Sequence, residues 1–554
     1  MDARAGGGWR HSLPAVQEGQ DAAGQLPVVI KLREKAFKYQ VLSWDDDALE
    51  PRGAETLRTY EEINERIKRG DAVVMTADEY VEYVKRYGVE KAAKEVDVVT
   101  TGTFGAMCSS GAFLNFGHSD PPIKMYRCWL NNVPAYKGLA AVDAYIGATA
   151  ISEDRGIEYG GGHVIEDLVS RKEVELRAEG YPTDCYPRRF LKTVVTIDDL
   201  NQAVLVNPRN AYQRYLAATN STDRVLYTYM GTLLPRYGNV MYSGAGQLSP
   251  LYKDRGFEVI GVGTRIFLGG GVGYVIGEGT QSKPQDLLAT IMVKGDLKKM
   301  SPRFLRGATV HRYGATLYVG LGIPIPIINE RVAATASTPD EEVFTEVVDY
   351  GVPSRSRPVV RRVSYAELKS GKVLIGDREV PASSMSSLTK AREVAEELKK
   401  LILEGEFTLA RPVELLPTHR ELKGLEVRGY EPRVKDVMTT KVVSASPDDD
   451  VREVAKLIVS HGVDHVPIVD RDGRLVGIVT SWDLARALAN DKRSLREVMT
   501  TRVVVARPHE ALDLVVARLE EHRISGMPVV DEAGRVVGIV TSDDIARLWR
   551  VRAA

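Results

Sequence analysis

The chain has 554 residues, which is enough for two large domains, and its 27% charged and 44% apolar residues are typical of a globular protein. Its 74 basic side chains nearly balance 75 acidic ones, so there is no electrostatic basis for binding nucleic acid or an anionic membrane surface. Three cysteines cannot form a disulfide framework, and the sequence has neither a secretory signal nor a long apolar span. We therefore expect a protein of the reducing cytoplasm.

Residues 1–28 have no apolar period, which predicts a disordered extension. Amphipathic helices near residues 60–67 and 76–87 are followed by short β-branched runs that alternate with glycine loops. This pattern predicts an α/β or α+β enzyme core over residues 29–380 and does not fix the strand order. The expected strands are 95–100, 192–197, 224–230, 257–262 and 315–320, and residues 323–326 are expected to form a proline-rich loop.

Two of the three cysteines lie in loops that are typical of a reactive thiol. Small and hydroxyl residues surround Cys108 after the apolar Val98-Val99, which predicts a loop leaving a strand. Cys185 lies in a proline-rich loop followed by Arg188 and Arg189, whose charges would favour the nucleophilic thiolate. A free cysteine is more often a packed hydrophobic residue, and we keep that interpretation for Cys128 and leave it open for the other two.

The glycine-rich segment 261–273 has neither the spacing nor the acidic residue of a dinucleotide-binding loop. It favours backbone that lies close to a small substrate or to a neighbouring strand. Arg265 within it is a candidate for binding a substrate carboxylate, with a surface arginine as the alternative. His163 and His118 are candidates for contact with substrate or for proton donation, although a lone histidine is more often packed or exposed.

The segment 381–433 predicts a connection between two halves of the chain. Residues 385–404 carry apolar side chains at helical spacing, and three prolines between 407 and 433 predict an extended linker. Beyond it, the segment from Val437 recurs at Val498, an offset of 61 residues, and Gly477 to Ser481 recurs as Gly538 to Ser542. Two copies of one supersecondary unit are therefore expected, at 434–492 and 493–554.

The two copies closely resemble a tandem pair of CBS domains with βαββα topology. In that family the cleft between the units binds AMP, ATP or S-adenosylmethionine. The resemblance implies that Thr480 with Asp483, and Thr541 with Asp544, bind the ribose hydroxyls, whereas these residues could also be helix caps only. The positions matching the apolar contacts to adenine are Val443, Val466, Val504 and Met527.

Four separated motifs in the N-terminal half resemble the homocysteine biosynthesis family, over roughly residues 30 to 375. They are the segments 101–112, 160–163, 182–186 and 263–270. The resemblance implies a catalytic domain that incorporates sulfur into L-aspartate semialdehyde to form L-homocysteine. A cysteine persulfide and a two-electron reduction would carry the chemistry, with Cys185 as the persulfide carrier and Cys108 as its partner. Arg188, Arg265 and His163 are the candidate substrate contacts.

The sequence contains no CxxCxxC cluster and no predicted metal site, so the electrons and the sulfur must come from outside the chain. We expect a ferredoxin-like iron–sulfur partner, an adenosine ligand at the CBS pair, no covalently bound cofactor, and a homodimer formed through the CBS pair. Two alternatives remain open. One is an oxidoreductase similar to IMP dehydrogenase, whose CBS pair is inserted within a barrel of βα repeats that this sequence lacks. The other is a non-catalytic adenosine-ligand sensor.

Overall fold

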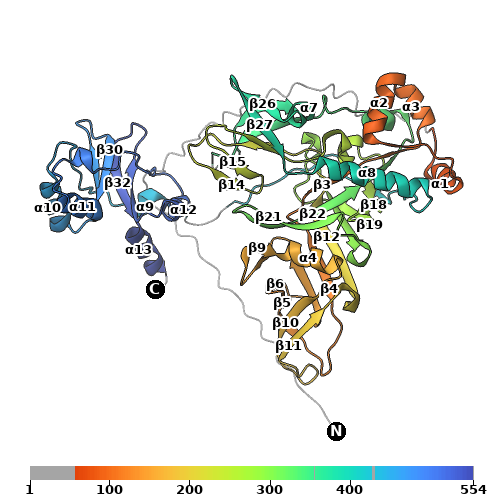
Figure 1. The fold of residues 1–554 in the computed structure, drawn as a ribbon, viewed down its shortest axis with the longest axis horizontal. Coiled ribbons are helices and arrows are strands. Elements are labelled where there is room, and N and C mark those ends of the chain that lie inside the picture. The colour runs from red at the N-terminus through yellow and green to blue at the C-terminus, as the bar shows by residue number, and fades with distance from the viewer. Residues whose placement is uncertain (1–56, 353, 355, 427–430, 553–554) are drawn as a thin grey trace, which may run out of the picture. The chain divides into compact units, whose positions relative to one another are not determined.

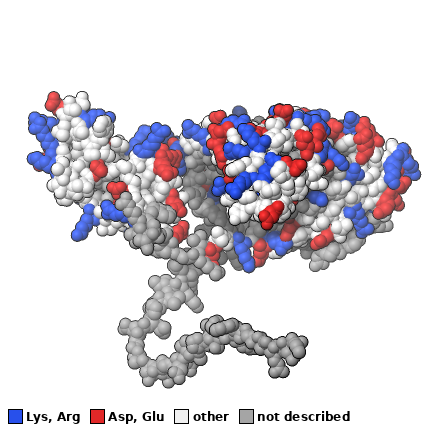
Figure 2. Space-filling view, turned by 90° about the horizontal axis from the view of Figure 1, so that it is seen from below, with Lys and Arg blue, Asp and Glu red and all other residues white. Residues whose placement is uncertain are grey.

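The computed structural model describes residues 57–552 except 353, 355 and 427–430, so the predicted disordered extension lies outside the described residues. The chain divides into a larger unit that ends at Leu422 and a smaller unit that begins at Lys423 (Figure 1). On the face of the larger unit seen in Figure 2, basic and acidic side chains alternate. No helix among the described residues is long and apolar enough to cross a membrane.

The larger unit begins with three helices, α1 (Tyr60–Arg69), α2 (Ala77–Tyr87) and α3 (Val89–Glu95). Capping boxes start the first two, because Thr59 and Thr76 each accept a backbone N–H from a glutamate three residues later. The two predicted helices are therefore confirmed. The other helices of this unit are α4 (Gly161–Val169), α5 (Pro250–Lys253), α6 (Glu330–Ala336), α7 (Tyr365–Lys369) and α8 (Leu388–Leu403).

A nine-stranded sheet forms the centre of the larger unit, and its neighbouring strands pair antiparallel in the order β21-β22-β18-β19-β20-β12-β4-β7, with β3 also on β22. Its strands are β3 (Thr103–Ala106), β4 (Gly111–Asn115), β7 (Asp143–Gly147), β12 (Gln202–Asn210), β18 (Arg265–Leu268), β19 (Gly271–Glu278), β20 (Ile291–Asp296), β21 (Leu305–Val310) and β22 (Gly314–Gly322). Segments that are far apart in the sequence therefore lie side by side in this one sheet.

A four-stranded sheet extends this layer, because a bridge between Tyr136 and Tyr145 joins the segment after β6 to β7. Its order is β11-β10-β5-β6, from β5 (Met125–Leu130), β6 (Val133–Ala135), β10 (Val174–Gly180) and β11 (Phe190–Val195). The two sheets share one hydrophobic core, in which Leu130 and Leu176 of the smaller sheet belong with Leu114 and Leu205 of the larger one.

A six-stranded sheet stands beside this core with the order β25-β24-β13-β16-β27-β26. Its strands are β13 (Ala217–Thr219), β16 (Val240–Tyr242), β24 (Phe344–Asp349), β25 (Val359–Ser364), β26 (Lys372–Ile375) and β27 (Arg378–Ser384). The smaller sheets comprise β1 (Val74–Thr76), β2 (Val98–Thr100) and β23 (Pro324–Pro326), and the pairs β8 (Ile151–Ser152) with β9 (Gly156–Gly160), β14 (Leu226–Thr228) with β15 (Gly231–Leu233), and β17 (Gly261–Val262) with β28 (Glu414–Leu415).

Helix α8 belongs to the larger unit, although the sequence assigned residues 385–404 to the connecting segment. Its apolar face, with Val394, Leu398 and Ile402, is buried against Ile63 and Val98. The predicted apolar periodicity is confirmed. Only the tertiary packing revealed which unit this face contacts.

Two of the sequence-based expectations in this unit are wrong. Residues 257–260 form no strand, because Phe257 has a left-handed φ of 50° and the buried Asp254 accepts the N–H groups of Glu258, Val259 and Ile260. Residues 324–326 form strand β23 instead of a loop. Proline is tolerated there because β23 is an edge strand that pairs only with β2.

The smaller unit confirms the predicted repeat. The first copy contains α9 (Val434–Val437), α10 (Val451–His461), β29 (His465–Val469), β30 (Leu475–Thr480) and α11 (Ser481–Ala489), and the second contains α12 (Leu512–His522), β31 (Gly526–Val530), β32 (Val536–Thr541) and α13 (Ser542–Arg552). The first strand of each expected βαββα unit is reduced to one bridge, Ala445 to Ile468 and Ala506 to Val529. Mixed α and β structure followed by a CBS-like pair is the fold class expected from the sequence.

Candidate active site

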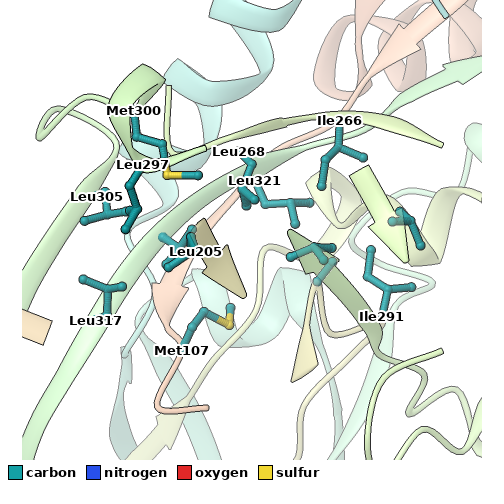
Figure 3. Packing of buried hydrophobic residues seen from close by; sticks show 14 of the residues in the cluster. Met107, Leu205, Ile266, Leu268, Ile291, Leu297, Met300, Leu305, Leu317 and Leu321 are labelled. Carbon is teal, nitrogen blue, oxygen red and sulfur yellow. The ribbon is translucent and has the colours of Figure 1, made fainter. Parts of the chain in front are cut away.

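Cys108 lies in a tight turn between β3 and β4, so the expected loop is shorter than predicted. The side chain of Met107 is buried and points into the hydrophobic core among Leu205 and Leu317 (Figure 3). The next residue, Cys108, is half-buried, and its Sγ atom lies 3.2 Å from the hydroxyl oxygen of Thr316 on β22. Burial of Met107 therefore helps to hold the thiol of the neighbouring Cys108 beside Thr316.

A buried amide holds the other side of this turn. Asn207 on β12 donates its Nδ2 hydrogen to the hydroxyl of Ser110 (2.8 Å) and accepts hydrogen bonds at Oδ1 from Ser109 (2.9 Å) and from the N–H of Arg209 (2.8 Å). Its side chain is completely buried. Since buried polar groups are costly when unpaired, these bonds fix the turn in one conformation.

Glycines bring helix α4 against the same strand. A Cβ atom on Gly162 would lie 2.1 Å from the carbonyl oxygen of Thr316, and one on Gly161 would lie 1.9 Å from that of Gly147. Only glycine permits such contact between helix and strand backbones. The predicted close backbone approach is thus found at residues 160–162 as well as in the segment 261–273, where a Cβ on Gly273 would lie 2.8 Å from that of Leu268.

Tyrosines from five segments form a cluster beside Cys108, and no local sequence pattern marks them. This tyrosine cluster consists of Tyr212, Tyr215, Tyr229, Tyr313, Tyr318 and Tyr350. Ring contacts and one hydroxyl pair, Tyr229 to Tyr350 at 2.6 Å, connect five of these residues. Tyr318 donates its hydroxyl to the carbonyl of Met385.

Burial raises the pKa of five tyrosines of this cluster, which holds their phenols in the neutral form: Tyr212, Tyr215, Tyr313, Tyr318 and Tyr350. Burial, and then the charge of a Cys108 thiolate, raise the pKa of Tyr313 and Tyr318. Burial also raises the pKa of Tyr212 to about 12, against the opposing effect of Arg209. Neutral phenols remain hydrogen-bond donors at neutral pH.

Cys185 has a different environment, in the turn between β10 and β11. Its thiol is exposed and lies 3.5 Å from the hydroxyl of Thr183. The Arg188 guanidinium, predicted to favour the Cys185 thiolate, instead donates hydrogen bonds to the carbonyls of Pro121 (2.9 Å) and Asp120. The arginine therefore attaches the Cys185 turn to the loop that follows β4.

The other predicted contact residues have structural partners. His163 accepts the N–H of Gly160 at Nδ1 (3.1 Å) and stacks on Tyr159, and burial lowers its pKa. The Arg265 guanidinium lies over Phe407, 4.5 Å from the ring centroid, and donates to the hydroxyl of Thr408 (3.0 Å).

His118 and Cys128 also lie outside the tyrosine cluster. The His118 ring stacks on Tyr186 with a centroid distance of 5.9 Å. Cys128 is 2% exposed, and burial raises the pKa of its thiol to about 12, which confirms it as a packed residue.

In the smaller unit, the two threonine–aspartate pairs have the same geometry. The carboxylate of Asp483 accepts the N–H and hydroxyl of Thr480 (3.0 and 2.8 Å), and Asp544 does the same for Thr541 (3.0 and 2.7 Å). These are helix caps, so a ligand would have to use the remaining carboxylate oxygen. Val443 and Val504 are half-buried, whereas Val466 and Met527 are fully buried in the cores of their repeats.

Comparison with known proteins decides between the alternatives left open by the sequence. The family of homocysteine biosynthesis enzymes of the sulfur-incorporation type matches residues 72–409. The chain belongs to this family. CBS domains match residues 434–490 and 495–550. The protein is therefore an enzyme of homocysteine biosynthesis with a CBS pair, and the alternatives of an IMP dehydrogenase-like oxidoreductase and a non-catalytic sensor are set aside.

Two curated relatives of this homocysteine biosynthesis enzyme extend over most of the chain. The L-aspartate semialdehyde sulfurtransferase of Methanocaldococcus jannaschii is 53% identical over 89% of this chain and 99% of its own length. The protein of the same name from Methanosarcina acetivorans is 52% identical over 89% and 98%. A crystal structure of a CBS domain pair in complex with 5′-methylthioadenosine and S-adenosyl-L-methionine is 44% identical over 22% of this chain and 99% of that one, with a TM-score of 0.22.

Proposed function

We propose that this enzyme incorporates sulfur into L-aspartate semialdehyde to form L-homocysteine. The observation that carries the proposal is the 53% identity, over almost the full length of both chains, to a relative named for this activity. Converting the aldehyde to the thiol with sulfide-level sulfur releases one water molecule and consumes two electrons and two protons. Sulfide forms a persulfide on Cys185 by attacking a disulfide of Cys185 and Cys108. The disulfide accepts the two electrons that sulfide loses, and Cys108 leaves as the thiolate that then attacks this persulfide. The disulfide forms again when homocysteine is released, so the net reaction still consumes two electrons from outside.

The substrate aldehyde is proposed to bind beside Cys108. Tyr212, Tyr313 and Tyr318 provide neutral phenols there, which donate hydrogen bonds to the aldehyde oxygen as it gains negative charge. Arg209 influences the pKa of Tyr212 in this cluster, and we propose it as the partner of the substrate carboxylate. The two arginines that the sequence suggests for this role, Arg188 and Arg265, have guanidinium groups that contact Asp120 and Phe407.

Electrons and sulfur are proposed to come from separate molecules in the reducing cytoplasm. A ferredoxin-like iron–sulfur protein supplies the electrons, and the exposed thiol of Cys185 is accessible to a sulfur donor. A measurement with two reductants tests the partner. Turnover with a reduced ferredoxin-type protein should exceed turnover with dithiothreitol, and equal rates would remove the need for such a partner.

The CBS pair is proposed to bind an adenosine ligand and to form the contact of a homodimer. The repeated threonine–aspartate pairs support the first part, because each aspartate has one oxygen that does not cap its helix. An adenosine compound derived from methionine, such as S-adenosylmethionine, would couple the enzyme to the end of its own pathway.

Anaerobic incubation tests the activity directly. The full-length chain, L-aspartate semialdehyde, sodium sulfide and titanium(III) citrate should yield homocysteine, measured by mass spectrometry. Omitting the aldehyde is the matched control. Failure to form homocysteine with any combination of sulfide and reductant would contradict the proposal.

A further inference from the structure

The two cysteines of the proposed mechanism are attached to opposite ends of strand β4, Cys108 directly and the turn of Cys185 through the loop that follows the strand. Cys108 precedes its first residue, Gly111, and the N–H of Ala148 binds the carbonyl of Ser110 at that end. The turn of Cys185 is bonded through Arg188 to Asp120 and Pro121, which follow the other end of β4. At about 3.4 Å per residue, a strand of this length separates the two ends by about 15 Å.

The register of the sheets adds a second separation, across the strands. Going across the sheets from Cys108, β4 pairs with β7, and β7 pairs through Tyr145 with Tyr136, which directly follows β6. Strand β6 then pairs with β5, and β5 pairs with β10, which leads into the Cys185 turn. Adjacent strands are about 4.8 Å apart, so several strand spacings lie between the two turns. In Figure 1 the β10–β11 hairpin extends to the lower end of the larger unit, whereas β3 and β22 lie near its centre.

Direct sulfur transfer requires the two sulfur atoms to come into contact, since a disulfide bond is about 2 Å long. The four-stranded sheet does not move as a separate body, because Leu130, Leu176 and Ala178 are buried in the same core as Leu114 and Leu205. Separating these residues would expose close-packed apolar surface to water. Transfer within one chain therefore conflicts with the packing of the larger unit.

The end of the hairpin that carries Cys185 has the features of a contact surface. Tyr181 and Phe190 are 73% and 71% exposed, and Tyr126, which the strand register places near Glu179, is 58% exposed. Exposed aromatic side chains that gather in one place mark protein contact sites. On the other side, the tyrosine cluster beside Cys108 reaches the surface at Tyr313, which is 45% exposed.

We propose that the sulfur passes between two copies of the chain, from Cys185 of one copy to Cys108 of the other. The Cys108 thiolate attacks the outer sulfur of the Cys185 persulfide. The sulfur–sulfur bond at Cys185 breaks, a new one forms at Cys108, and Cys185 leaves as a thiolate, so no electrons are gained or lost in the step. The inference rests on the proposed function of both cysteines. The hairpin end around Tyr181 and Phe190 is the surface that contacts the second copy.

Complementation between two inactive full-length variants tests this transfer. Cys108→Ser and Cys185→Ser chains with different affinity tags are co-expressed, and the mixed assembly is isolated through both tags. One complete pair of cysteines then forms between the chains, so a two-fold dimer should recover about half of the wild-type homocysteine formation. Each variant alone should be inactive, and a Cys128→Ala pair carrying the same two tags should keep full activity.

The outcomes separate this inference from the function on which it rests. An active single variant would contradict the proposed roles of the cysteines. Inactive single variants with an inactive mixed assembly would overturn transfer between copies, as would a wild-type chain that is a monomer with activity independent of concentration. A second measurement avoids substitution at the cysteines: after mild oxidation of mixed ¹⁴N and ¹⁵N chains, a Cys185–Cys108 disulfide joining peptides of unlike isotope supports the inference, and only like-isotope disulfides would refute it.

Discussion

The hydroxyl oxygen of Thr316 lies 3.2 Å from the sulfur of Cys108, although 208 residues separate the two along the chain. Strand β3 pairs with β22 and places both residues at the same end of the nine-stranded sheet. The hydroxyl can donate a hydrogen bond to a Cys108 thiolate, so we expect Thr316 to act as a positioning residue for this proposed nucleophile.

We predict that Thr316→Val slows the reaction of Cys108. Loss of a hydrogen bond to a charged group costs about 1.5–3 kcal/mol, so alkylation of Cys108 by iodoacetamide at pH 7 should slow by a factor of about 10 to 150. Thr309→Val on the neighbouring strand β21 is the control, because its hydroxyl bonds to the backbone carbonyls of Ile157 and Glu158. Equal alkylation rates in the wild type and both variants would show that Thr316 has no such role.

The two cysteines of the proposed mechanism should behave as one unit. Cys108→Ser and Cys185→Ser should each abolish homocysteine formation, because oxygen cannot carry a transferable sulfur, and the double variant should be little worse than either. Treating Cys108→Ser with a sulfur donor should leave one added sulfur at Cys185, detected by peptide mass spectrometry. Finding that sulfur only on Cys108 in the Cys185→Ser protein would reverse the roles.

The buried Lys253 should make stability depend on pH. It is fully buried, donates a hydrogen bond to the carbonyl of Thr338 (2.7 Å), and burial lowers its pKa to about 7. Between pH 7 and about 10 the unfolded state binds more protons at this lysine than the folded state, so its contribution to stability rises with pH in that window. Below pH 7 both states are protonated and the penalty for the buried charge is complete.

Lys253→Met should remove this dependence. Urea unfolding at pH 7 and pH 9.5 should show a rise in wild-type stability, on the order of 3 kcal/mol, that is smaller in the variant. The exposed Lys68, whose side chain pairs with Glu65 at 2.8 Å, provides the matched Lys68→Met control. An unchanged pH dependence in Lys253→Met would assign the effect to other groups.

The turn that replaces the expected strand at residues 257–262 should depend on Asp254. Its buried carboxylate accepts three backbone N–H groups at 2.8–3.0 Å, and these would be unpaired after Asp254→Ala. We expect a loss of about 3 kcal/mol in the free energy of unfolding, measured by urea denaturation. Asp254→Asn should retain part of the lost stability, because one oxygen acceptor remains in the side chain. A loss below 1 kcal/mol in the alanine variant would contradict this role.

The CBS pair offers a prediction with an internal control. Asp483→Ala and Asp544→Ala should each weaken calorimetric binding of S-adenosylmethionine to the full-length chain by about 1–3 kcal/mol. Asp450→Ala removes a carboxylate that caps helix α10 without belonging to either threonine–aspartate pair, and should leave affinity unchanged. Equal loss in all three variants would mean that helix capping, and not ligand contact, explains the effect. Absence of binding of S-adenosylmethionine, AMP and ATP to the wild type would refute the site.

Local chemistry in the sequence determined several helices, the repeat and the two loops in which the candidate cysteines lie. Thr59 with Glu62 marks a capping box within four residues, and the 61-residue repeat is visible because its copies keep the same apolar periods. Cys108 and Cys185 could be selected because the composition of each surrounding loop is itself local information.

Only the tertiary structure decided how distant segments meet. Contacts between residues far apart in the chain form the tyrosine cluster and bury helix α8. Such contacts also bring Arg188 to the backbone carbonyl of Pro121 and Arg265 to the ring of Phe407. Tertiary contacts also separate the two cysteines: Cys108 precedes β4, whereas Arg188 bonds the Cys185 turn to the loop that follows β4. A local pattern specifies the conformation and the buried face of a segment, but the partner that covers this face is selected by packing over the whole core.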